Sequence, residues 1–298
     1  MTLKIFFTFL AFFIFPAFSA ICQEQVDQGS DQQIMDFSLA SFGDKGKKSW
    51  DLAGKSADIF SDVVKLKEVV GNLYGKEEDI VLTADKGDFD KADGKIHLEE
   101  NVVITTSTGS KLTTDSLDWD RKKQLVTTKD AVNIERGNMV TTASGAYGEP
   151  SLKKVSLEKD VTVNINPDNA DKDSVRDVNK KIVITCDGPL EIDYDKNVAT
   201  FNNNVKVNTQ DVLIDSDIMD VYFGGTGKDA SALPKADSAM SSKIDKIVAR
   251  GNVKITRGEN VSYSDEATYD AAQNRIILSG RPKLVIYSQE GLDASFGN

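Results

Sequence analysis

The chain of 298 residues has few of the residue types from which catalytic and metal sites are built. It contains one histidine and two cysteines, with no nucleophile elbow, no phosphate-binding loop and no His or Cys pairs at metal-ligand spacing. Two cysteines also exclude a disulfide framework. The sequence therefore predicts a protein that is not an enzyme and that needs no metal or other cofactor.

The few such residues present fit structural roles. His97 alternates with Ile96 and Leu98, which predicts a surface residue without a partner. Cys186 lies in the strand-like run ITCDG and is expected to be a small core residue, in preference to pairing with Cys22 or acting as a nucleophile.

The chain has fewer basic than acidic residues. Lys and Arg number 36 against 47 Asp and Glu, giving a net charge of −11 and an isoelectric point near 4.7. Binding to nucleic acid requires clustered basic side chains that neutralise phosphates. The composition therefore argues against a nucleic-acid partner and indicates a solvated acidic surface.

Long apolar runs are missing except at the N-terminus. Residues 1–20 combine one early lysine, an apolar stretch, Pro16 and the small residues Ser19 and Ala20, a layout that predicts a secretory signal peptide cleaved just after Ser19 or Ala20. An uncleaved N-terminal membrane anchor is the alternative, because the run from Ile5 to Cys22 reaches the lower length limit for a bilayer span. Both interpretations predict an exported protein.

Helical periodicity is also missing, and strict alternation takes its place. Ile247, Ala249, Val253 and Ile255 share one face of an extended chain, with Gly251 between them. The same pattern recurs with a period of about thirty residues, which indicates a repeat architecture. Its other copies run through Val64, Leu66, Glu68 and Val70; Ile96, Leu98, Glu100, Val102 and Ile104; Val126 to Ile134; Val155 to Val163; Ala199, Phe201, Asn203, Val205 and Val207; and Ile276 to Leu284.

The midpoints of these strands form a column of glycine and polar residues. A strand with such a residue at its centre has room to bend or to carry a bulge. We therefore expect an all-β fold of two tandem twisted β-jelly-roll domains with a V-shaped sheet, built from two-strand repeats. A parallel β-helix is the structural alternative. The column is Glu68, Glu100, Asp130, Lys159, Asn203, Gly251 and Gly280.

Aspartates recur on the second strand of each repeat. Calcium loops place their ligands at alternate positions within one loop, whereas these aspartates are a whole repeat apart. Roles in turns and at strand ends are therefore the expectation. The residues are Asp85, Asp115, Asp217 and Asp265.

Composition marks the divisions of the chain. Residues 21–36 lack periodicity and are expected to be a tether, and residues 37–165 form a first β domain that opens with a hairpin. Residues 166–180 are polar and predict a linker, and residues 181–298 form a second β domain. A Gly, Ser and Ala-rich stretch at 224–243 predicts a flexible loop within it.

Both domains resemble families of lipopolysaccharide export. The run KIDKIVARGNVKITRGENVSYSDEATYDAAQNRIILSGRPKLV resembles the periplasmic LptA or OstA-like family. The segments DIVLTADKGDFD, KIHLEENVVITT, KLTTDSLDWD and QLVTTKDAVNIERGNMVTTASGAYG resemble the LptC family. Members of the two families are typically separate proteins, whereas this chain resembles both in tandem, and LptC relatives normally keep an N-terminal anchor in the inner membrane.

The resemblance implies a periplasmic protein that binds lipopolysaccharide and passes it from the inner-membrane transporter toward the outer membrane. Its domains would join edge to edge with the transporter and with bridge or translocon subunits, and acyl chains would lie in an apolar β groove. By this analogy the inner-face residues contact lipid, although alternating apolar residues are far more often simple core. The candidates are Leu66, Val70, Ile96, Leu98, Val102, Ile104, Phe201, Val205, Ile247, Ala249, Val253 and Ile255.

A second function remains open. A secreted β-solenoid that binds polysaccharide or forms a structural filament would have a similar strand pattern. Polysaccharide binding would require a cleft of paired carboxylates or an aromatic stripe on an outer face, and the sequence shows neither clearly.

Overall fold

The computed structural model describes residues 31–43, 46–75, 78–166, 181–224, 244–273 and 275–287. The expected signal peptide or anchor, nearly all of the expected linker and loop, and residues 288–298 lie outside this part of the chain. No helix in the described ranges is long and apolar enough to cross a membrane.

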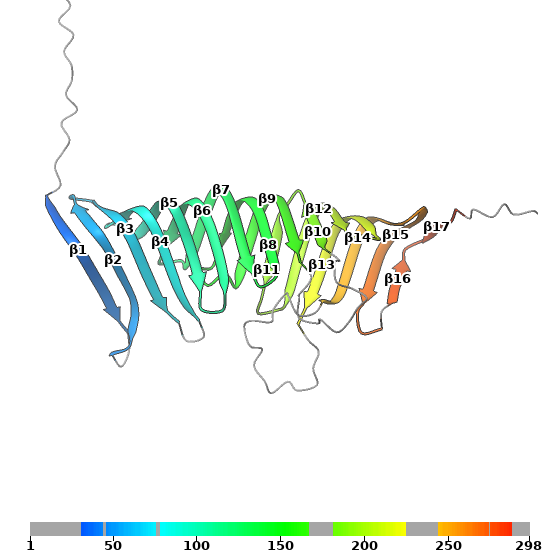
Figure 1. Ribbon diagram of the computed structural model, residues 1–298, viewed down its shortest axis with the longest axis horizontal. Helices are drawn as coiled ribbons and strands as arrows, with labels where there is room; N and C mark the ends of the chain where they lie inside the picture. The colour runs from blue at the N-terminus through cyan, green and yellow to red at the C-terminus, as the bar shows by residue number, and fades with distance from the viewer. Residues whose placement is uncertain are drawn as a thin grey trace, which may run out of the picture.

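The described chain folds as one antiparallel sheet of 17 strands, which follow one another along the long axis from β1 at one end to β17 at the other (Figure 1). The all-β prediction is confirmed. The first strand begins at Gln32, inside the expected tether. The strands are β1 Gln32–Phe42, β2 Lys48–Ile59, β3 Val63–Tyr74, β4 Asp79–Asp90, β5 Lys95–Thr106, β6 Ser110–Asp120, β7 Leu125–Arg136, β8 Met139–Gly148, β9 Lys154–Ile165, β10 Ile182–Cys186, β11 Leu190–Asp193, β12 Val198–Asn208, β13 Leu213–Phe223, β14 Ile244–Arg257, β15 Asn260–Asp270, β16 Arg275–Ser279 and β17 Lys283–Val285.

The two expected domains share this sheet. Strand β9 of the first pairs on one edge with β8 and on the other with both β10 and β11 of the second. Strand β12 then pairs with the same two short strands. Together β10 and β11 therefore occupy the place of a single strand, and backbone pairing continues without a break across the boundary.

Most long strands bend at their midpoints, where the sequence predicted a fold line. Residues with positive φ lie there, including Glu68 in β3 and Gly251 in β14, and most strand pairs shift register at the same level. Leu66 and Leu73, on opposite sides of the bend in β3, line the same cavity. The two halves of each strand therefore face each other, which gives the sheet a V-shaped section.

All four repeated aspartates lie at this bend, where the strand pairs shift register, and three of them have a partner there. Asp85 accepts a hydrogen bond from Asn101 Nδ2 at 2.6 Å, and Asp217 accepts one from Asn252 Nδ2 at 2.8 Å. Asp265 lies 3.9 Å from the guanidinium of Arg281. The expectation of turn and strand-end roles is wrong, because each strand runs through both half-sheets and its middle is the bend.

A different set of aspartates closes the turns between strands. In each case the side chain at the end of one strand accepts a hydrogen bond from the backbone N–H three residues later. This bond fixes the reversal that brings the next strand back alongside. The bonds are Asp93 N to Asp90 at 3.1 Å, Lys123 N to Asp120 at 3.0 Å, Lys196 N to Asp193 at 3.0 Å and Gln273 N to Asp270 at 3.2 Å.

Apolar side chains fill the space between the half-sheets through the middle of the molecule. Leu157, Leu190, Phe201 and Met219 are completely buried there. A cation–π contact joins the two expected domains, because Arg136 of the first lies over the ring of Tyr194 of the second at 3.8 Å. Within the second domain, the ring of Tyr194 is 5.6 Å from that of Phe223. The core is therefore continuous across the junction.

Candidate functional site

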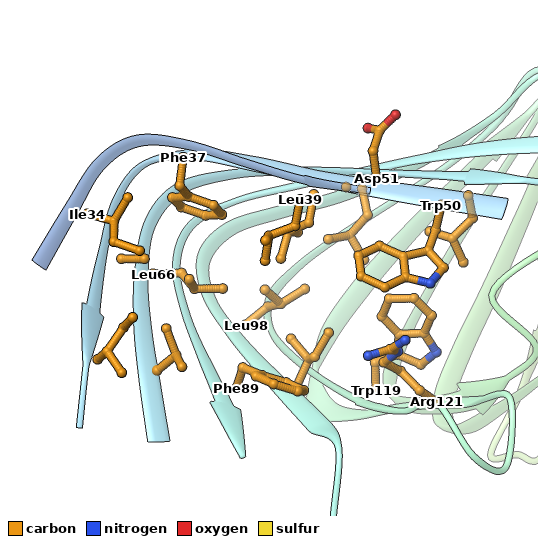
Figure 2. Close-up of a pocket in the computed structure, with 18 residues that line it drawn as sticks. Ile34, Phe37, Leu39, Trp50, Asp51, Leu66, Phe89, Leu98, Trp119 and Arg121 are labelled. Carbon is orange, nitrogen blue, oxygen red and sulfur yellow. The ribbon is translucent and has the colours of Figure 1, made fainter. Parts of the chain in front are cut away.

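An apolar cavity opens between the half-sheets at the β1 end of the molecule (Figure 2). Its volume is about 240 Å³. Side chains from β1 to β6, together with Arg121 in the turn after β6, form its wall. They are Ile34, Phe37, Leu39, Trp50, Asp51, Leu52, Ala57, Ile59, Val64, Leu66, Gly71, Leu73, Leu82, Phe89, Ile96, Leu98, Trp119 and Arg121.

The cavity is open at the edge of the sheet. In β1, Ile34 is 45% exposed and Leu39 is 55% exposed although both line the cavity. Leu98 on the opposite wall has no exposed surface. The cavity is therefore a trough that begins at the edge strand and ends against the packed core.

Asp51 contributes its backbone, and not its carboxylate, to the cavity wall. Figure 2 shows its carboxylate directed away from the interior. There it accepts hydrogen bonds from Asn72 Nδ2 at 2.6 Å, Tyr74 Oη at 2.8 Å and Lys48 Nζ at 3.0 Å. These bonds, that from Asn72 foremost, hold the pKa of Asp51 below its usual range. The carboxylate stays ionised on the outer face and contributes no charge to the cavity.

Arg121 brings a positive charge to one end of the cavity. Its guanidinium carbon lies 4.8 Å from the ring centroid of Trp50. Trp119 lies beside them in Figure 2, at the end opposite Ile34. The indole N–H of Trp119 is buried and has no hydrogen-bond acceptor among the described residues.

The predicted lipid contacts divide into two groups. Three of them, Leu66, Ile96 and Leu98, line the cavity. The others on the inner face lie in or against the packed core beyond it. Those are Val102, Ile104, Phe201, Val205, Ala249 and Val253, which are buried, and Ile247 and Ile255, which are partly buried.

The inner-face prediction for Val70 is wrong. Val70 is 39% exposed, and its neighbour Val69 is buried at 1% instead. The bend of β3 contains one positive-φ residue, Glu68, whereas the bend of β5 contains two. Because the bend of β3 is one residue shorter, the alternation after it is shifted by one position, and the inner face continues through Val69 and Gly71.

Sequence reasoning missed most of the cavity wall. The first domain was expected to open with a hairpin, which the pairing of β1 with β2 confirms, and this hairpin contains Phe37, Leu39, Trp50 and Leu52. Their position at an open end of the sheet was not predicted. The available signal was that the hairpin is the first unit of the repeat, and within the described residues its strand β1 pairs with β2 alone.

The opposite end of the sheet is also open. Strands β16 and β17 each pair only with β15 within the described residues. Ile276, Ile277 and Leu284 are 53%, 43% and 61% exposed there. Among the described residues, the inner-face side chains Ile276 and Leu284 are therefore exposed at this end, whereas Ile277 lies on the outer face.

The histidine and the buried cysteine, the other residues that could carry chemistry, play structural roles. His97 has two partners, contrary to the prediction of none: Nδ1 lies 2.7 Å from Asp118 and Nε2 lies 3.0 Å from Glu99. Cys186 is buried, as predicted, and burial raises the pKa of its thiol. Among the described residues, no three His, Cys, Asp or Glu side chains are grouped so that they could hold a metal ion.

Comparison with protein families agrees with the strand order. The model described as "Lipopolysaccharide-assembly, LptC-related" matches residues 5–166. The model described as "LptA/(LptD N-terminal domain) LPS transport protein" matches residues 188–295. No curated protein matches the chain. The two matches meet near the junction of β9 with β10 and β11, and they confirm the resemblance of the two halves in the order predicted.

Proposed function

Since the chain belongs to the LptC-related family of lipopolysaccharide assembly, we propose that it passes lipopolysaccharide from the inner-membrane transporter toward the outer membrane. Both matched families are families of lipopolysaccharide transport and assembly, which is not an enzymatic activity. Acyl chains enter the trough at β1 and travel between the half-sheets toward β17. The observation that supports this most is the apolar cavity at the open end of a sheet that spans both family regions.

Apolar burial supplies the binding energy. Each methylene group removed from water contributes about 0.8 kcal/mol, so ten methylenes contribute roughly 8 kcal/mol. A wall of aliphatic and aromatic side chains is sufficient to hold an acyl chain by this effect alone. The other predicted contacts, from Val102 to Ile255, would meet lipid only as it moves deeper along the interior.

The edges of the sheet suit partner proteins. Within the described residues β1 pairs only with β2, which leaves one row of its backbone groups unpaired. Addition of a partner strand at such an edge is a common mode of association. We place the inner-membrane transporter at the β1 edge and an outer-membrane translocon or bridge subunit at the β17 edge.

This function requires export. Residues 1–20 would act as a signal peptide or stay as an inner-membrane anchor, and either leaves the sheet in the periplasm. We further propose that residues 37–165 and 181–298 are the two functional units, joined by residues 166–180, with a loop at 224–243.

Site-specific photo-crosslinking in cells tests the proposal. A photoreactive residue at Leu39 faces the cavity, and one at Ala40 faces outward from the same strand with similar exposure. We expect lipopolysaccharide to crosslink from position 39 and not from position 40. A second pair, Val253 and Lys254, reports on the deeper interior.

Equal crosslinking from 39 and 40, or none from either in a folded and exported protein, would contradict the lipid groove. The polysaccharide-binding or filament-forming alternative would then be favoured, since neither requires lipid in the interior.

A further inference from the structure

The end of the cavity that holds Trp50, Trp119 and Arg121 differs chemically from the rest. Of the side chains that line the cavity, two carry charge, Asp51 and Arg121. The Asp51 carboxylate is turned outward and held by three donors. Arg121 is therefore the charged group of this wall that is available to something inside the cavity.

Arg121 is placed to accept a second partner. Its guanidinium stacks over Trp50, and no carboxylate in the described part of the chain lies within ion-pair distance of it. A guanidinium that stacks by its face keeps its N–H groups free at its edge. That edge matches the paired oxygens of a phosphate group, with which arginine forms two parallel hydrogen bonds.

Trp119 adds an unpaired donor at the same end. Its buried Nε1–H lacks an acceptor within the described residues. Buried donors nearly always have partners, and leaving one unpaired costs about 1–3 kcal/mol. An oxygen-rich ligand group at this end of the cavity would offset that cost.

The neighbouring turn carries more positive charge. Arg121, Lys122 and Lys123 follow one another after β6, in a protein whose net charge is −11. Lys122 and Lys123 are exposed to solvent, and Lys123 Nζ lies 3.5 Å from the carboxylate of Asp120. An amphipathic ligand with apolar chains and a negative headgroup complements this arrangement, since its chains fit the trough while its charge meets the basic turn.

The geometry points to Arg121, stacked on Trp50 and next to Trp119, as the recognition point for a phosphate of the lipid headgroup. This inference rests on the proposed function and deepens it. The trough holds the acyl chains, and Arg121 fixes which end of the lipid lies toward the basic turn. The site would thus select phosphorylated lipids over neutral lipids with the same chains.

The intrinsic fluorescence of the full chain provides a direct test. The protein has two tryptophans, and both line the cavity. Their emission therefore reports on this site when lipid is titrated. The probes are a diphosphorylated lipid A, the same lipid without its phosphates, and inorganic phosphate alone.

We expect the phosphorylated lipid to bind about tenfold more tightly than the dephosphorylated one, as charge-assisted hydrogen bonds predict. Arg121→Gln should remove this preference, so that the two lipids bind the variant with equal affinity. Arg121→Lys should keep part of the preference. Lys206→Gln, which removes the same charge from an exposed position in β12 outside the cavity wall, should keep all of it. Inorganic phosphate alone should give no change below millimolar concentration, because it lacks the acyl contacts.

Equal affinity of the wild type for the two lipids, or an Arg121→Gln variant that keeps the preference, would overturn the inference. Saturable binding of inorganic phosphate alone at micromolar concentration would also overturn it, since the site would then serve free phosphate. In all of these cases crosslinking from Leu39 would still support lipid transport. Loss of that crosslinking, together with no fluorescence response to either lipid, would instead reject the proposed function.

Discussion

His97 is a single residue whose charge state affects stability. Burial lowers its pKa, but hydrogen bonds to Asp118 and Glu99 outweigh that effect, and the net pKa is raised. A raised pKa in the folded state means that folding favours the protonated form. The contribution is full below the pKa of the unfolded chain, near 6.5, and is lost as pH rises through the higher folded value.

We predict that His97→Gln lowers the free energy of unfolding at pH 5.5 and has little effect at pH 8.5. The loss at low pH should stay below about 1 kcal/mol, because the pair is partly exposed and screened by solvent. Urea unfolding at the two pH values measures it. An equal loss at both would show that neutral contacts, and not the ion pairs, account for the role of His97.

Gly71 controls the width of the cavity. A Cβ at this position would meet Leu52 at 3.6 Å and Leu82 at 3.9 Å, which are ordinary contacts. Alanine should therefore be tolerated, whereas the longer side chain of leucine must extend into the cavity.

We predict that Gly71→Leu weakens lipid binding roughly tenfold, since it displaces about two methylenes of ligand contact. Gly71→Ala should bind nearly as well as the wild type, and Val81→Leu, on the outer face of β4, should have no effect. Tryptophan fluorescence titration with lipid measures all three. Unchanged binding by a folded Gly71→Leu protein would exclude this part of the cavity from the binding path.

Two glycines with the same φ, one in a turn and one in a bend, separate the backbone cost of an alanine substitution from its steric cost. Gly94 in the turn after β4 and Gly251 in the bend of β14 both have φ of 76°. A Cβ at Gly94 meets nothing within 4 Å, whereas one at Gly251 would lie 2.9 Å from Asp217 Cβ and closer still to its carboxylate. The two positions therefore share the backbone cost of alanine but not the steric cost.

We predict that Gly94→Ala lowers the free energy of unfolding by about 1 kcal/mol, the cost of a left-handed residue with a side chain. Gly251→Ala should cost at least about 1 kcal/mol more, because Asp217 must move and its bond from Asn252 is strained. Chemical denaturation measures the difference. Equal losses would show that Asp217 rearranges freely and does not hold the bend.

The bends also mark the limit of prediction from sequence. Alternation fixes which residues share a face within one half of a strand, so Leu66, Ile96 and Leu98 were placed correctly. The number of residues in a bend is set by how neighbouring strands pair through it, which no local pattern reveals. Val70 was misplaced for this reason. The position of the cavity could not be predicted from the sequence either, because it depends on where the stack of repeats ends.

The whole molecule is held together differently along its length and across its interior. Backbone pairing connects neighbouring strands along the long axis, whereas within the described residues no strand pair connects the facing halves of the V. Side-chain packing alone closes the interior around Phe201 and Met219. Separating the half-sheets would therefore break apolar contacts and no backbone hydrogen bonds, and an acyl chain that entered would replace the lost contacts.

The junction at β9 should hold the two halves together without a covalent link. We predict that insertion of a protease site between Ile165 and Ile182, followed by cleavage, yields two fragments that co-elute in gel filtration. Pairing of β9 with β10 and β11 and the contact of Tyr194 with Arg136 continue across that point.

Two variants of β10 test which contacts hold the fragments together. Ile184→Asp, which places a charge at a position 3% exposed, should release the fragments after cleavage. Val183→Asp, on the opposite and partly exposed face of β10, should not. Separation of the cleaved wild-type fragments would mean that the covalent connection, and not edge pairing, maintains one path through both halves.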